Sequence, residues 1–190
     1  MSLDHLIALA ALAERCAVDL EPDVERYLAL VRRTLKGGGT LFFAGNGGSA
    51  AHAQHVATEY VVRYLPVSRP AARALALSTD SSLLTAAGND LGFEAIFARQ
   101  IEAHGRPGDL LVVISTSGGS PNCLRAAEAA RAKGLATVGL LGRDGGKLKS
   151  LVDVAIVVPS NDTALVQEVQ LAIDHHVCAV IEKEMVAGSR

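Results

Sequence analysis

The chain has 190 residues, of which 49% are apolar, and a formal net charge of -2 at pH 7. This length fits one domain with a single core, and no apolar run approaches the roughly 20 residues that a membrane-spanning helix needs. The small net charge and the absence of a basic cluster argue against nucleic-acid binding. The first residues lack the basic start and cleavage site of a signal peptide, and three widely spaced cysteines favour free thiols over a disulfide. We therefore expect a cytoplasmic protein.

Helical and apolar patterns alternate along the chain. Residues 3–36 carry a helical repeat that ends at three glycines, and Pro22 marks the start of a second helical piece. The predicted strands are residues 40–44, 74–77, 110–114, 137–141 and 154–158. The predicted helices are residues 49–64, 81–87, 93–104, 121–133, 146–151 and about 163–185, the last with Asn161 or Asp162 as its N-cap.

This alternation predicts one α/β domain over residues 1–190, a three-layer sandwich whose five-stranded parallel sheet is flanked by helices. An N-terminal helical segment covers about residues 1–36, and the α/β core covers about residues 40–190. In such a fold, ligands bind outside the carboxyl ends of the strands.

The most informative segment is residues 115–120, Ser-Thr-Ser-Gly-Gly-Ser, between the apolar run 110–114 and a helical pattern. Free backbone N–H groups, the positive end of the helix dipole and the hydroxyl donors together favour a phosphate there. Residues 110–124 contain no lysine or arginine. We therefore expect a neutral-donor site for a sugar phosphate, because the P-loop of a nucleotide triphosphate site would need Gly-Lys-Ser/Thr.

A second glycine-rich loop, residues 45–50, reads Gly-Asn-Gly-Gly-Ser-Ala and matches one form of the dinucleotide fingerprint. A nicotinamide site would want an acidic residue at the end of the second strand, and Asp80 comes later than that pattern expects. Asp80 also belongs to a serine-rich loop, residues 78–82, which resembles another polar wall of a ligand pocket. We expect the three loops to converge at one edge of the sheet. A dinucleotide site and a purely structural glycine turn are the alternatives.

Ionisable groups gather on two predicted helices. His52, His55 and Glu59 lie within about 60° of one another on one helix face. A histidine and a glutamate at this spacing can share a metal or act as an acid–base pair, and a surface hydrogen bond is the simpler alternative. The last helix carries a second polar set, Gln167, Glu168, Gln170, Asp174, His175 and His176. There, a surface pair of Glu168 with His175 is the alternative, and we expect one of the two adjacent histidines to face inward.

Several segments together resemble the phosphoheptose isomerases of the sugar isomerase (SIS) domain superfamily, whose sheet is flavodoxin-like or Rossmann-like. They are GNGGSAAHAQH at 45–55, TDSSLLTAAGND at 79–90, GRPGDLLVVISTSGGSPN at 105–122, GRDGGKL at 142–148, and Gln167-Glu168 followed by His175. Such enzymes interconvert sedoheptulose 7-phosphate and D-glycero-D-manno-heptose 7-phosphate through a cis-enediol. This is the first step toward nucleotide-activated heptoses of the kind found in lipopolysaccharide.

The resemblance implies a role for each matching residue. Substrate contacts are implied for Asn46, Gly47, Gly48, Ser49, Glu59, Asn89, Asp90, Ser115, Thr116, Ser117, Ser120 and Gln167. Glu59 would be the catalytic base and His175 its acid–base partner. One zinc ion per subunit would be held by His55, Glu59, Gln167 and His175, without a nucleotide cofactor. A homotetramer with sites at subunit interfaces is implied too, and the apolar faces of the first and last helices also favour self-association.

Two positions depart from the family pattern. His52 stands where an aspartate is common, and Leu165 stands where an arginine is frequent. Because His52 shares a face with the predicted site, it is expected to alter metal affinity or substrate preference. One alternative function is a non-catalytic SIS protein, such as the replication regulator that binds DnaA, although retention of Glu59 and His175 argues against it. Another is an isomerase of a different sugar phosphate.

Overall fold

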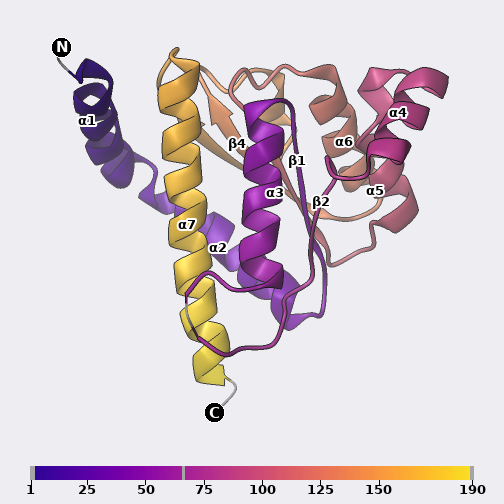
Figure 1. Ribbon diagram of the computed structural model, residues 1–190, viewed down its shortest axis with the longest axis horizontal. Helices are drawn as coiled ribbons and strands as arrows, with labels where there is room; N and C mark the ends of the chain where they lie inside the picture. Colours follow the sequence, from indigo (N-terminus) through magenta and orange to yellow (C-terminus); the bar gives the residue numbers. More distant parts are fainter. Residues whose placement is uncertain (1–2, 66, 189–190) are drawn as a thin grey trace.

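Five parallel strands form the central sheet of the computed structural model, which describes residues 3–65 and 67–188 (Figure 1). The strands are β1 (Leu41–Gly45), β2 (Ala74–Ala76), β3 (Leu110–Ser115), β4 (Ala136–Gly142) and β5 (Val154–Val158). Their order is β2-β1-β3-β4-β5. This is the flavodoxin-like order, in which the winding direction reverses between β1 and β3 and ligands bind at the carboxyl ends of these two strands.

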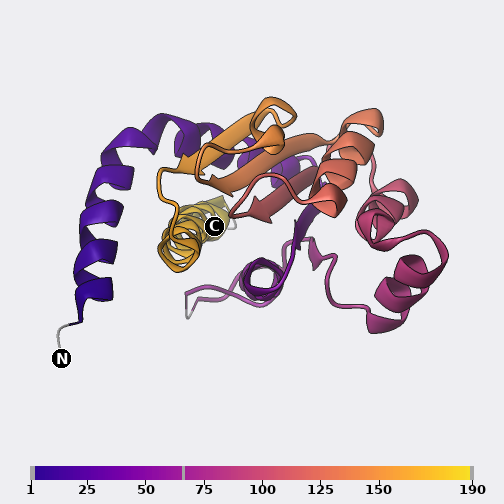
Figure 2. The same cartoon turned by 90° about the horizontal axis from the view of Figure 1, so that it is seen from above.

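Helices cover both faces of the sheet (Figure 2). One face carries α2 (Glu21–Lys36), α3 (Gly48–Val61) and α7 (Thr163–Gly188), and α1 (Asp4–Asp19) packs outside this layer against α7 and α2. The other carries α4 (Ser81–Asp90), α5 (Ala98–His104), α6 (Pro121–Ala132) and the short 3-10 turns η1 (Phe93–Ala95) and η2 (Lys147–Ser150). The predicted three-layer α/β sandwich with a five-stranded parallel sheet is therefore confirmed.

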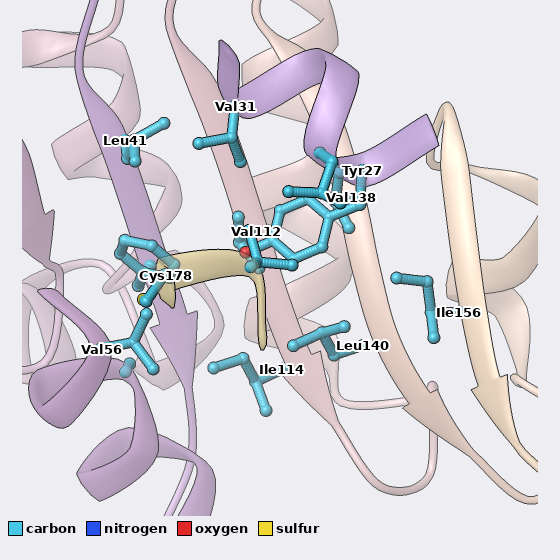
Figure 3. Close-up of a cluster of buried hydrophobic side chains, with 14 of the residues drawn as sticks. Tyr27, Val31, Leu41, Val56, Val112, Ile114, Val138, Leu140, Ile156 and Cys178 are labelled. Carbon is cyan, nitrogen blue, oxygen red and sulfur yellow. The ribbon is translucent and has the colours of Figure 1, made fainter. Parts of the chain in front are cut away.

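Alternate residues of each strand divide between two apolar clusters. Val112 and Ile114 of β3 meet side chains of α2, α3 and α7 on one face, as Figure 3 shows, while Leu111 and Val113 face the other helices. All four side chains are completely buried. A strand buried on both faces is apolar throughout, which explains why the predicted run 110–114 agrees with β3 to within one residue.

Two predicted helices are wrong in detail. The predicted helix over residues 93–104 is interrupted, because η1 and α5 are separated at Ile96 and Phe97. Both of these side chains are buried in the cluster beneath α6, and the break in the helix allows them to reach it. The predicted helix over residues 146–151 is only the 3-10 turn η2, which brings Leu148 into the same cluster.

Pro22 lies in the first turn of α2, as expected. The free thiols are confirmed, because the three cysteines are unpaired and buried. Burial raises the pKa of Cys123 to about 12, which leaves the thiol protonated at neutral pH.

No helix in the described part of the chain is long and apolar enough to cross a membrane. Residues 1–2 and 189–190, the ends of the predicted domain, lie outside the described residues.

Candidate active site

Two loops meet where β1 and β3 end side by side, because these strands pair up to the last residue of β1. Residues 46–49 follow β1, and residues 115–120 begin at the end of β3. Two side-chain amides join the loops: Asn46 Nδ2 donates to Asn122 Oδ1 over 2.9 Å, and Asn122 Nδ2 donates to Asn46 Oδ1 over 2.7 Å. Asn122 was not among the predicted site residues. Its only sequence signal is its place directly after the Ser-Pro start of a helix.

The loop of residues 115–120 is stabilised by a hydrogen bond within it and by packing against the turn after β4. Within it, the N–H of Gly118 donates to Ser115 Oγ over 3.1 Å. Behind it, the turn after β4 packs so closely that a Cβ on Gly118 would lie 1.9 Å from the carbonyl oxygen of Gly145. Gly118 also has φ +62°, a conformation that favours glycine. The hydroxyl-rich loop is therefore supported by its own hydrogen bond and by the turn packed behind it.

Two helix N-termini lie at these loops without a side-chain cap. Ser120 is the N-cap of α6 and Gly47 is the N-cap of α3, and neither forms a side-chain capping bond within the described residues. The hydroxyl-bearing residues Thr116, Ser117 and Ser120 are half-buried. Backbone N–H groups at a helix start favour an anion, so this edge of the sheet suits a phosphate.

α3 and α7 run side by side in the same direction (Figure 1). Near their first turns, the Gln167 side chain packs on Gly48, where a Cβ would lie 2.5 Å from Gln167 Nε2. Further along, His55 Nε2 lies 2.8 Å from His175 Nε2, and the two ring centroids are 5.1 Å apart. The two helices, each carrying a histidine of the site, therefore contact each other both at Gly48 and at His55.

Three ionisable side chains lie together between these helices: His55, Glu59 and His175. Glu59 Oε1 is 3.6 Å from His55 Nε2, which is too long for the simple hydrogen bond considered as an alternative. The ring of Tyr64 lies 5.5 Å from that of His175, centroid to centroid. Burial lowers the pKa of His175 and the neighbouring His55 lowers it further, although Glu59 opposes them. His175 is therefore neutral near pH 7 and able to accept or donate a proton.

The two adjacent histidines of α7 face different surroundings. His175 is half-buried against α3, whereas His176 is exposed and lines a groove between α1, α2 and α7. Glu168 does not pair with His175. It pairs instead with His5 of α1, whose Nε2 lies 2.9 Å from Glu168 Oε2. His175 is thus the inward member of the pair.

Three predicted site residues lie apart from the ionisable group. Gln167 precedes His175 by eight residues, roughly 12 Å along the helix axis at 1.5 Å per residue. Asn89 and Asp90 lie exposed at the end of α4, where Asn89 Nδ2 donates to Asp90 Oδ1 over 2.7 Å. No hydrogen bond in residues 3–65 and 67–188 joins either of them to the two loops.

A buried polar pair lies beneath the site. His52 Nε2 is 2.8 Å from Asp174 Oδ2, and the Tyr27 hydroxyl donates to Asp174 Oδ1 over 2.8 Å. Asp174 is completely buried, and His52 is 8% exposed. The departure from the family pattern at His52 is thus an interior contact that joins α3 to α7. Sequence spacing alone did not pair these two residues.

The fold and the loops at the β1–β3 edge are those of an SIS-domain protein. The chain matches the model of the SIS domain family over residues 5–142. A phosphoheptose isomerase from Akkermansia muciniphila is 48% identical over 185 residues, which cover 97% of this chain and 93% of that protein.

Solved structures agree with this relationship. A phosphoheptose isomerase from Neisseria gonorrhoeae matches with a TM-score of 0.88 and 37% identity, covering 95% of this chain and 96% of that one. One from Francisella tularensis matches with a TM-score of 0.91 and 33% identity, covering 95% of each chain. The chain belongs to the phosphoheptose isomerases of the SIS domain family. It is a sugar phosphate isomerase.

Proposed function

We propose that the chain interconverts sedoheptulose 7-phosphate and D-glycero-D-manno-heptose 7-phosphate, the first step toward a nucleotide-activated heptose. The arrangement along α3 carries this proposal. The helix starts at the hydroxyl-rich loops and presents His55 and Glu59 two to three turns later, roughly 10 Å along its axis and beyond. A long sugar phosphate can place its phosphate on the loops and its carbonyl end beside the ionisable groups. Phosphate binding then supplies energy remote from the reacting carbons and fixes their position.

Ketose-to-aldose conversion moves one proton between carbons and another between oxygens. In the proposed reaction, Glu59 removes the proton from C1 and returns it to C2. His175 donates a proton to the C2 oxygen and accepts one from the C1 hydroxyl, which its neutral imidazole allows. The intermediate is a cis-enediol, and no atom is gained or lost.

We also propose that one zinc ion is held by His55, Glu59, Gln167 and His175. The imidazole nitrogens of His55 and His175 already converge at 2.8 Å, whereas two nitrogens on one tetrahedral zinc lie roughly 3.3 Å apart. No group of three or more His, Cys, Asp or Glu side chains in the described ranges is arranged as a ready-made metal site. The donor types nevertheless suit zinc. A small separation of the two rings would admit the ion beside Glu59, whereas Gln167, roughly 12 Å from His175 along the helix axis, would reach it only by turning its side chain from Gly48 toward the ion. When bound, zinc would polarise the carbonyl as a Lewis acid or hold the pocket in shape.

The decisive experiment is turnover of sedoheptulose 7-phosphate by the Glu59→Gln variant, followed by NMR of the aldose anomeric proton. We expect turnover to be abolished while calorimetry still detects substrate binding, with Glu168→Gln as the exposed control. Near-normal turnover by Glu59→Gln would refute its role as the base. Turnover by the parent protein of another sugar phosphate in a panel would favour the alternative substrate. Binding without turnover of any sugar would favour the non-catalytic alternative.

We propose further that the chain assembles as a homotetramer. α1 projects from the body of the molecule and exposes Leu6 and Ile7 (Figure 2), and Leu3 directly before it is 70% exposed. Between α1, α2 and α7 lies a largely apolar groove of about 510 Å³. A second copy that covers both features would remove apolar surface from water. Light scattering should give four times the 19.7 kDa of one chain, and Ile7→Asp should lower this mass.

A further inference from the structure

An ion pair inside the protein connects α7 to the segment between α3 and β2. Arg69 Nε donates to Glu182 Oε1 over 2.7 Å, and each side chain is only 2% exposed. Glu182 follows His175 by seven residues, two turns further along α7. Figure 1 shows the segment after α3 passing beside the second half of α7 before it reaches β2. This pair belongs neither to the phosphate loops nor to the reacting groups.

Glu182, the carboxylate of the pair, fixes Tyr64, which is a neighbour of His175. Glu182 accepts the backbone N–H of Tyr64 over 2.9 Å and also that of Leu65. The ring of Tyr64 in turn packs against His175. Burial raises the pKa of Glu182, but the hydrogen bonds from Leu65, Tyr64 and Arg69 together lower it more, so the group stays ionised. Glu182 thus holds Tyr64 beside the imidazole.

The guanidinium end of the pair fixes the helix that carries the base. Arg69 Nη2 donates to the carbonyl oxygen of Glu59 over 2.6 Å, and Nη1 donates to that of Tyr60 over 2.9 Å. These carbonyls lie in the last turn of α3, where no helical N–H follows to bond them. A cation at this end also suits the helix dipole. Arg69 therefore caps α3 at the residue that carries the carboxylate.

We propose that Arg69 and Glu182 are positioning residues for proton transfer. One ion pair sets both the backbone of Glu59 and the packing of His175, and so the alignment of the two groups across the gap between α3 and α7. A lysine at position 69 keeps the charge but lacks the planar fork that reaches two helix carbonyls and a carboxylate together. The expected loss in the rate of isomerisation rests on the proposed function, whereas the expected change in the packing of the His175 ring does not.

A control pair of the same two residue types, with side chains 33% and 39% exposed, lies two residues along α7. Glu184 accepts from Arg32 of α2, with Nε to Oε2 at 2.8 Å and Nη2 to Oε1 at 2.6 Å. This Arg–Glu pair also ties α7 to another helix, but it touches neither Tyr64 nor the end of α3. Its removal tests the loss of an interhelical ion pair without loss of the proposed positioning.

The experiment compares Arg69→Lys and Glu182→Gln with Arg32→Lys and Glu184→Gln in the full chain, at a temperature where circular dichroism shows folded protein. For sedoheptulose 7-phosphate we expect kcat to fall about 10- to 100-fold in the first pair, with KM changed less than about threefold, since the phosphate loops lie elsewhere. The control pair should keep both constants within about twofold. An unchanged kcat in folded Arg69→Lys, or an equal loss in all four variants, would overturn the proposal.

A second measurement separates this proposal from the proposed function. The ring protons of His175, assigned in NMR spectra by their loss in His175→Asn, report the packing of Tyr64 without any substrate. We expect them to shift or broaden in Glu182→Gln and in Arg69→Lys but not in Glu184→Gln. A parent protein that converts no sugar phosphate contradicts the proposed function alone, and unchanged ring signals in both variants contradict the positioning role. If Glu182→Gln does not fold, Arg69→Lys decides.

Discussion

His55 Nε2 and His175 Nε2 lie 2.8 Å apart although their residues are 120 positions apart in the chain. At this distance only one of the two nitrogens carries a hydrogen, so one ring donates and the other accepts. The rings meet because α3 and α7 run in parallel, in a register that also places Gln167 on Gly48. The site is therefore a product of helix packing.

The facing histidines lead to a prediction about metal binding. Dialysed protein should bind about one zinc ion per chain, since metal replaces the shared hydrogen between two imidazoles. His55→Asn and His175→Asn should each lower the zinc affinity by about tenfold or more. His176→Asn, next along α7 but facing the other way, should bind as the parent does. Isothermal calorimetry at neutral pH measures this, and equal affinity in all four proteins would contradict it.

The hydroxyl-rich loop of residues 115–120 contains two adjacent glycines, Gly118 and Gly119, that allow a test of its geometry. Gly118→Ala forces a Cβ to within 1.9 Å of the Gly145 carbonyl oxygen at a φ of +62°. We expect it to lower the free energy of unfolding by about 1–3 kcal/mol or more and to raise KM for the sugar phosphate. Gly119→Ala is the control, since the atoms nearest to its Cβ lie 3.9 and 4.0 Å away. Urea unfolding and steady-state kinetics check both variants, and similar behaviour of the two would count against the assigned loop geometry.

The buried pair under the site should show strong energetic coupling. His52→Leu removes the 2.8 Å contact and leaves the fully buried Asp174 side chain with only the Tyr27 hydroxyl, so we expect a loss of about 1–3 kcal/mol in the free energy of unfolding. In the double variant His52→Leu/Asp174→Leu, neither member of the pair is left without the other, and the loss should be smaller than the sum of the single losses. A double-mutant cycle by urea unfolding measures this coupling. Additivity within about 0.5 kcal/mol would show that the two groups act independently.

The sequence predicts the sheet well and the interior polar contacts poorly. Strands such as 110–114 are recognisable because a parallel strand buried on both faces is apolar throughout. Both glycine loops could be placed as well, since they follow such strands directly. The predicted helix over 93–104 is wrong because it is interrupted at Ile96 and Phe97, whose side chains are buried in the core. A periodic apolar pattern does not show how deeply an individual side chain is buried.

In the site, too, the sequence predicts contacts within one helix but not contacts between distant segments. The nearness of His55 and Glu59 follows from one turn of helix, and sequence spacing shows it. The contact of His55 with His175, and the pair of Arg69 with Glu182, join segments more than 100 residues apart. Their formation depends on how α3 and α7 pack, so no spacing rule predicts them.

Acid should weaken the ion pair of Glu182. Burial raises its pKa, but hydrogen bonds from Leu65, Tyr64 and Arg69 lower it more, so the folded-state value lies below the ordinary 4.5. The unfolded chain then takes up the proton first, and stability present above pH 4.5 is lost as the pH falls through the folded-state pKa. The gap in unfolding free energy between the parent and Glu182→Gln should be widest near neutral pH and narrow below about pH 4.5. Urea unfolding across this range tests it, and a gap independent of pH would contradict the assigned pair.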